Sequence, residues 1–206
     1  MAATRAATRA GTGIEVNPQD VLDFWFGAAN SAEFGSARTQ WFRKDGAFDK
    51  LIAEQFGATV QTALAGELPD WAAAGPSGLA RIVVLDQFTR NIFRGTARAF
   101  SGDALALAAA QAMLTRGDDT ALLPVQRAFV YLPLEHAEDL AAQQRCVSLF
   151  SHLAEQHPTL QGMLDYAIRH HGVIQRFGRF PHRNAVLGRP STAEELDFLK
   201  LPGSSF

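Results

Sequence analysis

Large apolar residues recur along most of the chain at intervals of three and four, which is the spacing of one face of an α-helix. The clearest run consists of Phe48, Leu51, Ile52, Phe56, Val60 and Leu64. Alternating runs of Val, Ile and Thr joined by hairpin turns, which are typical of β-sheets, are absent from the sequence. The pattern therefore predicts an all-α protein with about eight or nine helices.

Capping and breaking residues mark where the predicted helices begin and end. Asn17 followed by Pro18 supplies an N-cap and a first helical residue, and Gly27 ends this helix. The other predicted helices lie around Trp41 and Phe42, over 48–64, from Ser77 to 93, over 101–116, from Pro124, from Pro133 to about 150, over about 160–175, and after Ser191 or Thr192, which are in capping-box spacing with Glu194 or Glu195.

The length fits one large domain, because 206 residues can bury a substantial hydrophobic core. Residues 1–16 begin with a stretch rich in Ala and Thr, which predicts a flexible N-terminal tail, and residues 17–206 are predicted to form a single helical domain. The short connections suit antiparallel helix pairs, as in a bundle or a helical solenoid, although no clean repeat at the tetratricopeptide period is present.

Charge and cysteine content restrict the partners and the compartment. The formal net charge of −2 gives no global signature of nucleic-acid binding, and no apolar run approaches the roughly 18 residues of a membrane span. Cys146 is the only cysteine, which excludes an internal disulfide and fits a reducing compartment. We therefore expect a cytoplasmic protein without nucleic-acid or membrane partners; exposed aromatic surface would support a homodimer, unless those residues complete the core.

The segment LARIVVLDQFTRNIFR carries polar side chains on one face of a strongly apolar helix. At 100° per residue, one arc contains Asp86, Gln87, Arg90, Asn91 and Arg94. The preceding turn is apolar on all sides, which indicates that the helix enters the interior and that the arc lines a cavity. The alternative is an ordinary ion pair between Asp86 and Arg90 on a solvated face.

Two further stretches concentrate polar groups. In the segment EHAED, His136 can act as an acid, base or metal ligand, with Glu135 or Glu138 to orient it. Carboxylates in the first turn of a helix are the simpler explanation. The segment HHGVIQRFGRFPHRNAVLGR contains His170, Arg176, Arg179, His182, Arg183 and Asn184. Its arginines can recognise an anion, or they can neutralise Asp86, Glu135 and Glu138 within the fold.

The sequence resembles the bacterial family called domain of unknown function 924, from about Val21 to Leu199. The resemblance is carried by VLDFWFG, WFRKDGAFD, LDQFTRNIFRGTARAFSGDALAL, FVYLPLEHAEDL and RFGRFPHRNAVLGRPSTAEELDFL. It implies a tetratricopeptide-like helical fold and no established reaction. The family's characteristic polar positions match those named above; Thr89 stands where proline is usual, which predicts a straighter helix after Asp86.

Three classes of function follow from these residues, with substrate and cofactor unknown. The leading hypothesis is a pocket for a small anionic ligand, in which the arginines bind the anion and His136 or His182 transfers a proton with Glu135 or Glu138 as orienter. The alternatives are a tetratricopeptide-like scaffold for a protein or peptide, and a metal-dependent hydrolase or oxygenase with ligands among Glu135, His136, Glu138, His170 and His182.

Overall fold

The computed structural model describes residues 16–68, 71 and 75–205, and within these ranges the chain is helical and contains no β-strand. The all-α prediction is therefore confirmed. The helices are α1 (Pro18–Phe26), α2 (Gly46–Leu64), α3 (Pro76–Ile82), α4 (Thr89–Ile92), α5 (Asp103–Arg116), α6 (Pro124–Glu135), α7 (Leu140–Gln156), α8 (Gln161–Phe177) and α9 (Ala193–Phe198).

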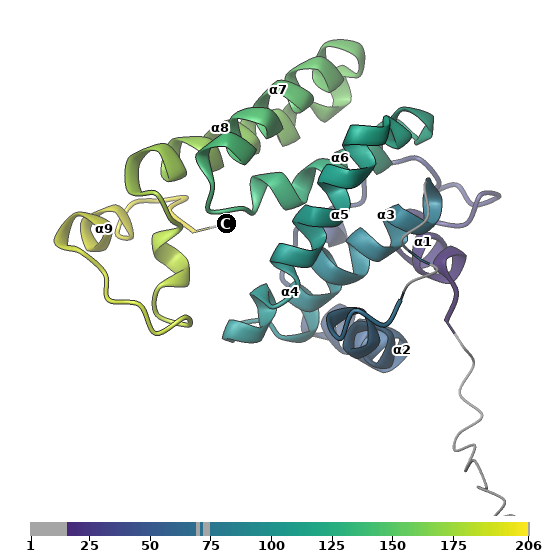
Figure 1. Ribbon diagram of the computed structural model, residues 1–206, viewed down its shortest axis with the longest axis horizontal. Helices are drawn as coiled ribbons and strands as arrows, with labels where there is room; N and C mark the ends of the chain where they lie inside the picture. The colour runs from purple at the N-terminus through teal and green to yellow at the C-terminus, as the bar shows by residue number, and fades with distance from the viewer. Residues whose placement is uncertain (1–15, 69–70, 72–74, 206) are drawn as a thin grey trace, which may run out of the picture.

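From α5 to α8, helices that follow one another in the chain pack side by side (Figure 1). The α3–α4 segment contacts α1 and α2, α5 packs between α3 and α6, and α7 pairs with both α6 and α8. The C-terminal segment with α9 lies beyond the end of α8 (Figure 1). A tetratricopeptide likeness stays a prediction, and residues 1–15 of the expected tail lie outside the described ranges; Val16 packs against the core.

Aromatic side chains form the centre of the core. The Trp41 ring lies 4.7 Å from the Phe129 ring, and the Phe26 ring lies 5.2 Å from the same Phe129, both edge to face. Trp25 and Phe88 complete this group and are fully buried. Edge-to-face aromatic pairs add about 0.5–1.5 kcal/mol each beyond the burial of their area. The cluster joins three elements: α1, α6, and the π-helical turn that follows α3. It therefore fixes the elements that carry the polar residues.

The predicted caps explain several helix ends. Asn17 and Asp20 form a reciprocal capping box at α1, and Thr192 and Glu195 form another at α9. Two boundaries predicted from the sequence are wrong. The region around Trp41 forms only the 3₁₀ turn η1 (Thr39–Trp41), and α3 begins at Pro76 rather than after a Ser77 cap.

Pro133 lies inside α6 instead of starting a new helix. A proline near the end of a helix removes only one of the last backbone hydrogen bonds, so α6 continues for two further residues. The next helix, α7, starts at Leu140, where the Asp139 side chain accepts a hydrogen bond from the backbone of Ala142. Glu135 is consequently the last residue of α6, and the interpretation that it begins a helix is wrong.

A π-helical turn, η3 (Val83–Phe88), connects α3 to α4 without a break. The Thr89 hydroxyl donates a hydrogen bond to the Leu85 carbonyl at 2.7 Å. Threonine therefore stands at the position where proline is usual in the family, and the π-helical turn ends just before it. Gly102 packs directly on the turn: a Cβ atom at this position would lie 2.1 Å from the Leu85 carbonyl oxygen. π-Turns inside α-helices are frequent at functional sites, and this one contains the buried Asp86 and Gln87.

Candidate functional site

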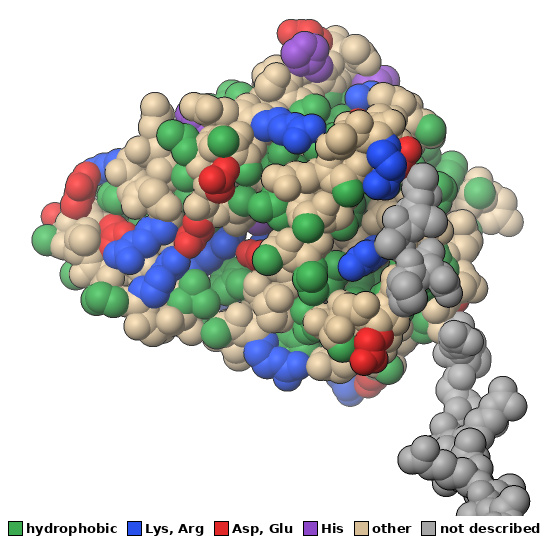
Figure 2. All heavy atoms as spheres, viewed as in Figure 1, with side chains coloured by type: hydrophobic (Ala, Val, Ile, Leu, Met, Phe, Trp, Pro, Cys, Tyr) green, Lys and Arg blue, Asp and Glu red, His purple; other side chains and the backbone are tan. Residues whose placement is uncertain are grey.

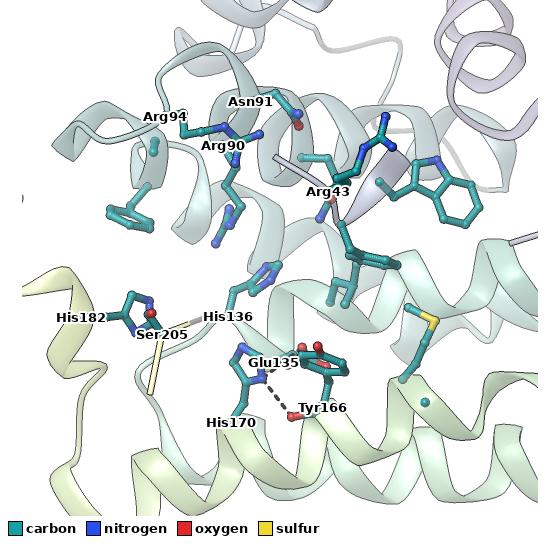
Figure 3. A pocket seen from close by; sticks show the side chains of 18 of the residues that line it. Arg43, Arg90, Asn91, Arg94, Glu135, His136, Tyr166, His170, His182 and Ser205 are labelled. Carbon is teal, nitrogen blue, oxygen red and sulfur yellow. Dashed lines mark hydrogen bonds and ion pairs between the residues drawn. The ribbon is translucent and has the colours of Figure 1, made fainter. Parts of the chain in front are cut away.

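A cavity of about 750 Å³ lies between the α4 region, the end of α6, α8 and the 3₁₀ turn η7 (Pro181–Arg183). Figure 3 shows Arg90 and Arg94 on one side of this cavity, Glu135, Tyr166 and His170 on the opposite side, and His136 between them. The sequence-predicted residues that line it are Gln87, Arg90, Asn91, Arg94, Glu135, His136, His170, His182 and Arg183. Three polar stretches that are distant in the sequence therefore meet at one cavity.

Asp86 lies directly behind the cavity lining and contacts three of its residues. Its Oδ1 atom is 3.1 Å from Arg90 Nη1 and 2.8 Å from His136 Nδ1, and its Oδ2 accepts a hydrogen bond from Gln87 at 2.6 Å. Burial opposes ionisation, but Arg90 and His136 outweigh it and hold the pKa of Asp86 well below its usual range. Asp86 is 1% exposed, so the interpretation of an Asp86–Arg90 pair on a solvated face is wrong.

Asp86 fixes the orientation of the His136 ring. Because Nδ1 of His136 is engaged by the carboxylate, Nε2 is the ring nitrogen that can accept a proton from a ligand. Burial and the nearby Arg90 charge lower the pKa of His136, against the opposing pull of Asp86. His136 is thus a neutral, oriented imidazole at neutral pH, as a general base requires.

Glu135 has the opposite electrostatic character. Burial, together with the Asp86 charge, raises the pKa of Glu135 to about 8 in spite of Arg90. Its position at the C-terminal end of α6 also disfavours a negative charge, because this end of the helix dipole is negative. Among the described residues, its Oε2 atom has no hydrogen-bond partner. Glu135 is therefore a protonated acid at neutral pH.

His170 and Glu135 lie in contact across the cavity wall. The His170 Nδ1 atom is 2.9 Å from the Tyr166 carbonyl oxygen, which can only accept, and 3.3 Å from Glu135 Oε1 (Figure 3). Burial and His136 lower the pKa of His170 to about 3, and burial with Arg183 lowers that of His182 to about 4. The contact between His170 and Glu135 therefore joins two neutral groups at neutral pH.

Four arginines line the cavity within the described part of the chain: Arg43, Arg90, Arg94 and Arg183. Their carboxylate partners lie outside the lining. Asp103 Oδ1 is 2.8 Å from Arg90, Asp103 Oδ2 is 3.3 Å from Arg183, and Asp49 lies 2.7 Å from Arg94. The cavity surface consequently presents guanidinium groups, with the compensating charges set behind them.

Arg183 is held by aromatic rings as well as by Asp103. Its guanidinium carbon lies 4.6 Å from the centre of the Phe100 ring and 4.4 Å from that of Phe180. Burial and the Arg90 charge lower the pKa of Arg183 to about 10, so it stays cationic at neutral pH. Two buried atoms, Arg90 Nη2 and Arg183 Nε, find no acceptor among the described residues. Both atoms are shielded from solvent, so their positive guanidinium groups are stabilised by Asp103, Asp86 and the aromatic rings and only partly by hydrogen bonds.

The remaining four predicted site residues lie outside the cavity: Glu138, Arg176, Arg179 and Asn184. Glu138, Arg179 and Asn184 form, with Arg189 and Glu195, what we call the C-terminal ion-pair network. Arg179 donates to both Glu195 oxygens at 2.6 and 2.8 Å, and Arg189 bonds Glu138 at 2.9 Å. Asn184 connects the pairs, because it donates to Glu195 at 3.2 Å and accepts from Arg189 at 2.9 Å.

The network has a buried centre, Asn184 and Glu195, and its arginines are partly exposed. Arg176 pairs with Glu194 at 2.8 Å on the surface nearby. Basic and acidic side chains alternate over the region of α9 (Figure 2). The arginines here do neutralise carboxylates within the fold, but the expected partners are wrong: Arg176 and Arg179 pair with Glu194 and Glu195, and Glu138 pairs with Arg189.

Several lining residues were not predicted as site residues. Trp41, Phe42, Leu132, Leu160 and Met163 form an apolar part of the wall. Their helical spacing marks them as core, and nothing in the local sequence distinguishes a core side chain from one that faces a cavity. Asp103 was equally hidden, because an acidic residue in the first turn of a helix has an ordinary explanation.

The metal-dependent alternative can be compared with the geometry. Within the described ranges, no three His, Cys, Asp or Glu side chains are grouped so that they could hold a metal ion, so the geometry gives no support to the metal-dependent alternative. The protein-interaction scaffold and the homodimer stay predictions. No helix in the described part of the chain combines the length and the apolar character needed to cross a bilayer.

Comparisons with known proteins identify the family and one related solved structure. The profile of a family described as "Bacterial protein of unknown function (DUF924)" matches residues 21–203. A solved structure, the protein of unknown function ATU0120 from Agrobacterium tumefaciens, is 40% identical and covers 89% of this chain and 96% of its own, with a TM-score of 0.77. No curated protein matches the chain.

Proposed function

Because this chain belongs to the DUF924 family, for which no activity is described, we propose from the site alone that its cavity binds a small organic anion and transfers a proton to or from it. Asp86 and His136 would act as an oriented base, and Glu135 as an acid. The arginines of the lining would bind the anionic group. The proposal assigns no role in binding to Arg176 or Arg179, whose guanidinium groups are paired elsewhere.

One observation carries the proposal: the charges at the cavity are arranged in layers. Arg90, Arg94 and Arg183 are at its surface, Asp49 and Asp103 are behind them, and the one carboxyl group in the described lining is the neutral Glu135. An anion in the cavity would thus meet cationic and neutral groups first. Guanidinium groups also bond carboxylates and phosphates through two parallel N–H donors, which gives strong and directional binding.

The acid–base part of the proposal rests on Glu135 and His136, two consecutive residues of the cavity wall. Their environments shift their pKa values in opposite senses, so that Glu135 holds a proton and His136 lacks one at neutral pH. Such a pair is the general pattern of sites that catalyse proton transfer. An anion bound nearby would favour the protonated imidazole, so binding and proton uptake by His136 would be coupled.

Thermal unfolding with a panel of small carboxylates and phosphates tests the binding. A selected anion at about 100 times its dissociation constant should stabilise the protein by about 2.7 kcal/mol. Arg94→Gln should weaken binding at least about tenfold, because it removes a charge-assisted contact. The matched control Arg176→Gln, which changes an arginine with a similar partner outside the cavity, should bind as the native protein does. An equal loss in both variants, or no stabilisation by any anion, would contradict the proposal.

Calorimetry in buffers of different ionisation enthalpy tests the proton transfer separately. We expect net proton uptake on anion binding near neutral pH, and its disappearance in the variant His136→Gln. Binding without any linked proton in the native protein would remove the acid–base role and leave the binding site in place.

A further inference from the structure

The apolar part of the cavity wall identifies the class of ligand. We propose that the bound molecule is an amphipathic acid, with an oxyanion head at the arginines and an extended apolar body packed against Trp41, Phe42, Leu160 and Met163. This inference rests on the proposed function, because it uses the same cavity, and it goes beyond it by specifying what must be attached to the anion.

Apolar and polar lining residues follow one another along the same helix, both on α8 and on α6. Met163, Tyr166 and His170 all line the cavity from α8, and a helix rises 1.5 Å per residue, so the apolar Met163 precedes His170 by about 10 Å. On α6, the cavity-lining Leu132 precedes Glu135 and His136 by about one turn. The change from apolar to polar lining along both helices favours an elongated molecule with one polar end.

The exposure of Phe42 supports an apolar occupant. The Phe42 side chain is 64% exposed although it lies beside the aromatic core, with its ring 6.3 Å from that of Phe129. Tyr166, on α8, is 53% exposed and also lines the cavity. Burial of apolar surface is favourable in proportion to the area removed from water. A ligand body between these residues would remove apolar surface from water on both sides.

The size of the cavity points to the same class. Its volume of about 750 Å³ lies within the range of about 300–1,000 Å³ that is common for sites that bind organic molecules. A phosphate or acetate ion has only a few heavy atoms, and each water-sized group occupies about 30 Å³ in a liquid. Such an ion would fill a small fraction of the space and would leave the apolar wall in contact with water.

Titration calorimetry with acetate, butanoate, hexanoate and octanoate tests the proposal directly. A matched series of n-alkyl phosphates distinguishes the two common kinds of oxyanion head, and n-alkanols test whether a head group is required. Affinity should rise about fourfold for each added CH₂ group, which corresponds to about 0.8 kcal/mol, until the apolar wall is covered. The alkanols should bind much more weakly than the acids of equal length.

Two variants on α8 connect the effect to the cavity wall. Met163→Gln keeps a similar side-chain length but makes this part of the wall polar, and should weaken octanoate binding about tenfold while acetate binding is unchanged. Ile168→Gln is the matched control, because Ile168 is on the same helix, is 49% exposed and does not line the cavity. It should leave the whole series unchanged.

The outcomes separate this inference from the proposed function. If acetate or methyl phosphate binds at the arginines and longer chains add no affinity, the amphipathic ligand is wrong and the anion site stands. If alkanols bind as tightly as the acids, the oxyanion head is wrong and both proposals fail. If neither acid series binds, both proposals fail as well.

Discussion

The cavity and the C-terminal ion-pair network contain the same kinds of side chain, but the pKa values of their acids are shifted in opposite directions. In the network, the paired Arg179 lowers the pKa of Glu195 to about 2, and the pKa of Glu138, which pairs with Arg189, is also lowered although partial burial opposes this. At the cavity, burial raises the pKa of Glu135 and lowers that of Arg183. The network stabilises the charged forms of its acids, whereas the cavity environment disfavours charge on Glu135, Arg183 and the histidines of the lining.

This difference separates a cluster of mutually paired charges from the cavity, where we propose binding and proton transfer. The network has a partner for each charge described above, so it has little to offer a ligand. At the cavity, unsatisfied atoms remain on Arg90, Glu135 and Arg183 among the described residues. Functional sites commonly keep such unfavourable arrangements at the expense of stability. The comparison becomes quantitative through substitutions in both regions.

Asp86→Asn should have the largest effect. It removes the buried charge that holds Arg90 and His136, and breaking a buried ion pair on one side costs about 3–5 kcal/mol in the free energy of unfolding. Urea unfolding at neutral pH measures this loss. The control Asp49→Asn, at the partly exposed pair with Arg94, should cost only about 1 kcal/mol. Equal losses of stability at the two positions would mean that the buried Asp86 charge stabilises the fold no more than the partly exposed Asp49 charge.

Glu135→Gln should stabilise the protein by about 3 kcal/mol near neutral pH. The folded-state pKa of about 8 exceeds the reference value of 4.5, so the favourable contribution of this group is complete below about pH 4.5 and is lost as the pH rises to about 8. Glutamine resembles the protonated acid and has no such loss. The difference in unfolding free energy between variant and native protein should grow across this pH window and then level off. A constant difference would show that Glu135 is not a buried acid.

Glu138→Gln is the matched substitution in the network and should have the opposite sign. Glu138 accepts hydrogen bonds from Arg189 and from the backbone of Phe180, and loss of its charge should destabilise the protein by about 2 kcal/mol. Urea unfolding near neutral pH provides the value, and anion binding at the cavity should be unchanged. If Glu135→Gln and Glu138→Gln shift stability in the same direction, the proposed contrast between the regions fails.

Arg176→Gln should have the smallest effect, below about 0.5 kcal/mol, because its pair with Glu194 is half-exposed and screened by solvent. Thermal unfolding at low and high salt measures this contribution. A large and salt-insensitive loss of stability would show that the Arg176–Glu194 pair contributes to the fold as strongly as a buried ion pair.

The sequence predicted the helices better than their boundaries, and the polar stretches better than their roles. Asn17 and Thr192 cap the helices that were expected after them. Pro133 misled, because a proline is accepted both at the start and near the end of a helix, and only packing selects between these positions. The same error placed Glu135 in a first helical turn, where its charge would be favourable, instead of at a helix end, where it is not.

The sequence by itself determined the all-α class, several caps and the three polar stretches, since these depend on residues a few positions apart. Tertiary structure decided which arginine meets which acid. Asp86 and His136 are 50 residues apart, and Asp103 and Arg183 are 80 apart, so no local pattern could predict that these pairs meet beside one cavity. Nor could a local pattern predict that Arg179 pairs instead with Glu195. Burial decides the protonation of Glu135, because the free energy of a charge depends on everything packed around it, and that environment exists only after the chain has folded.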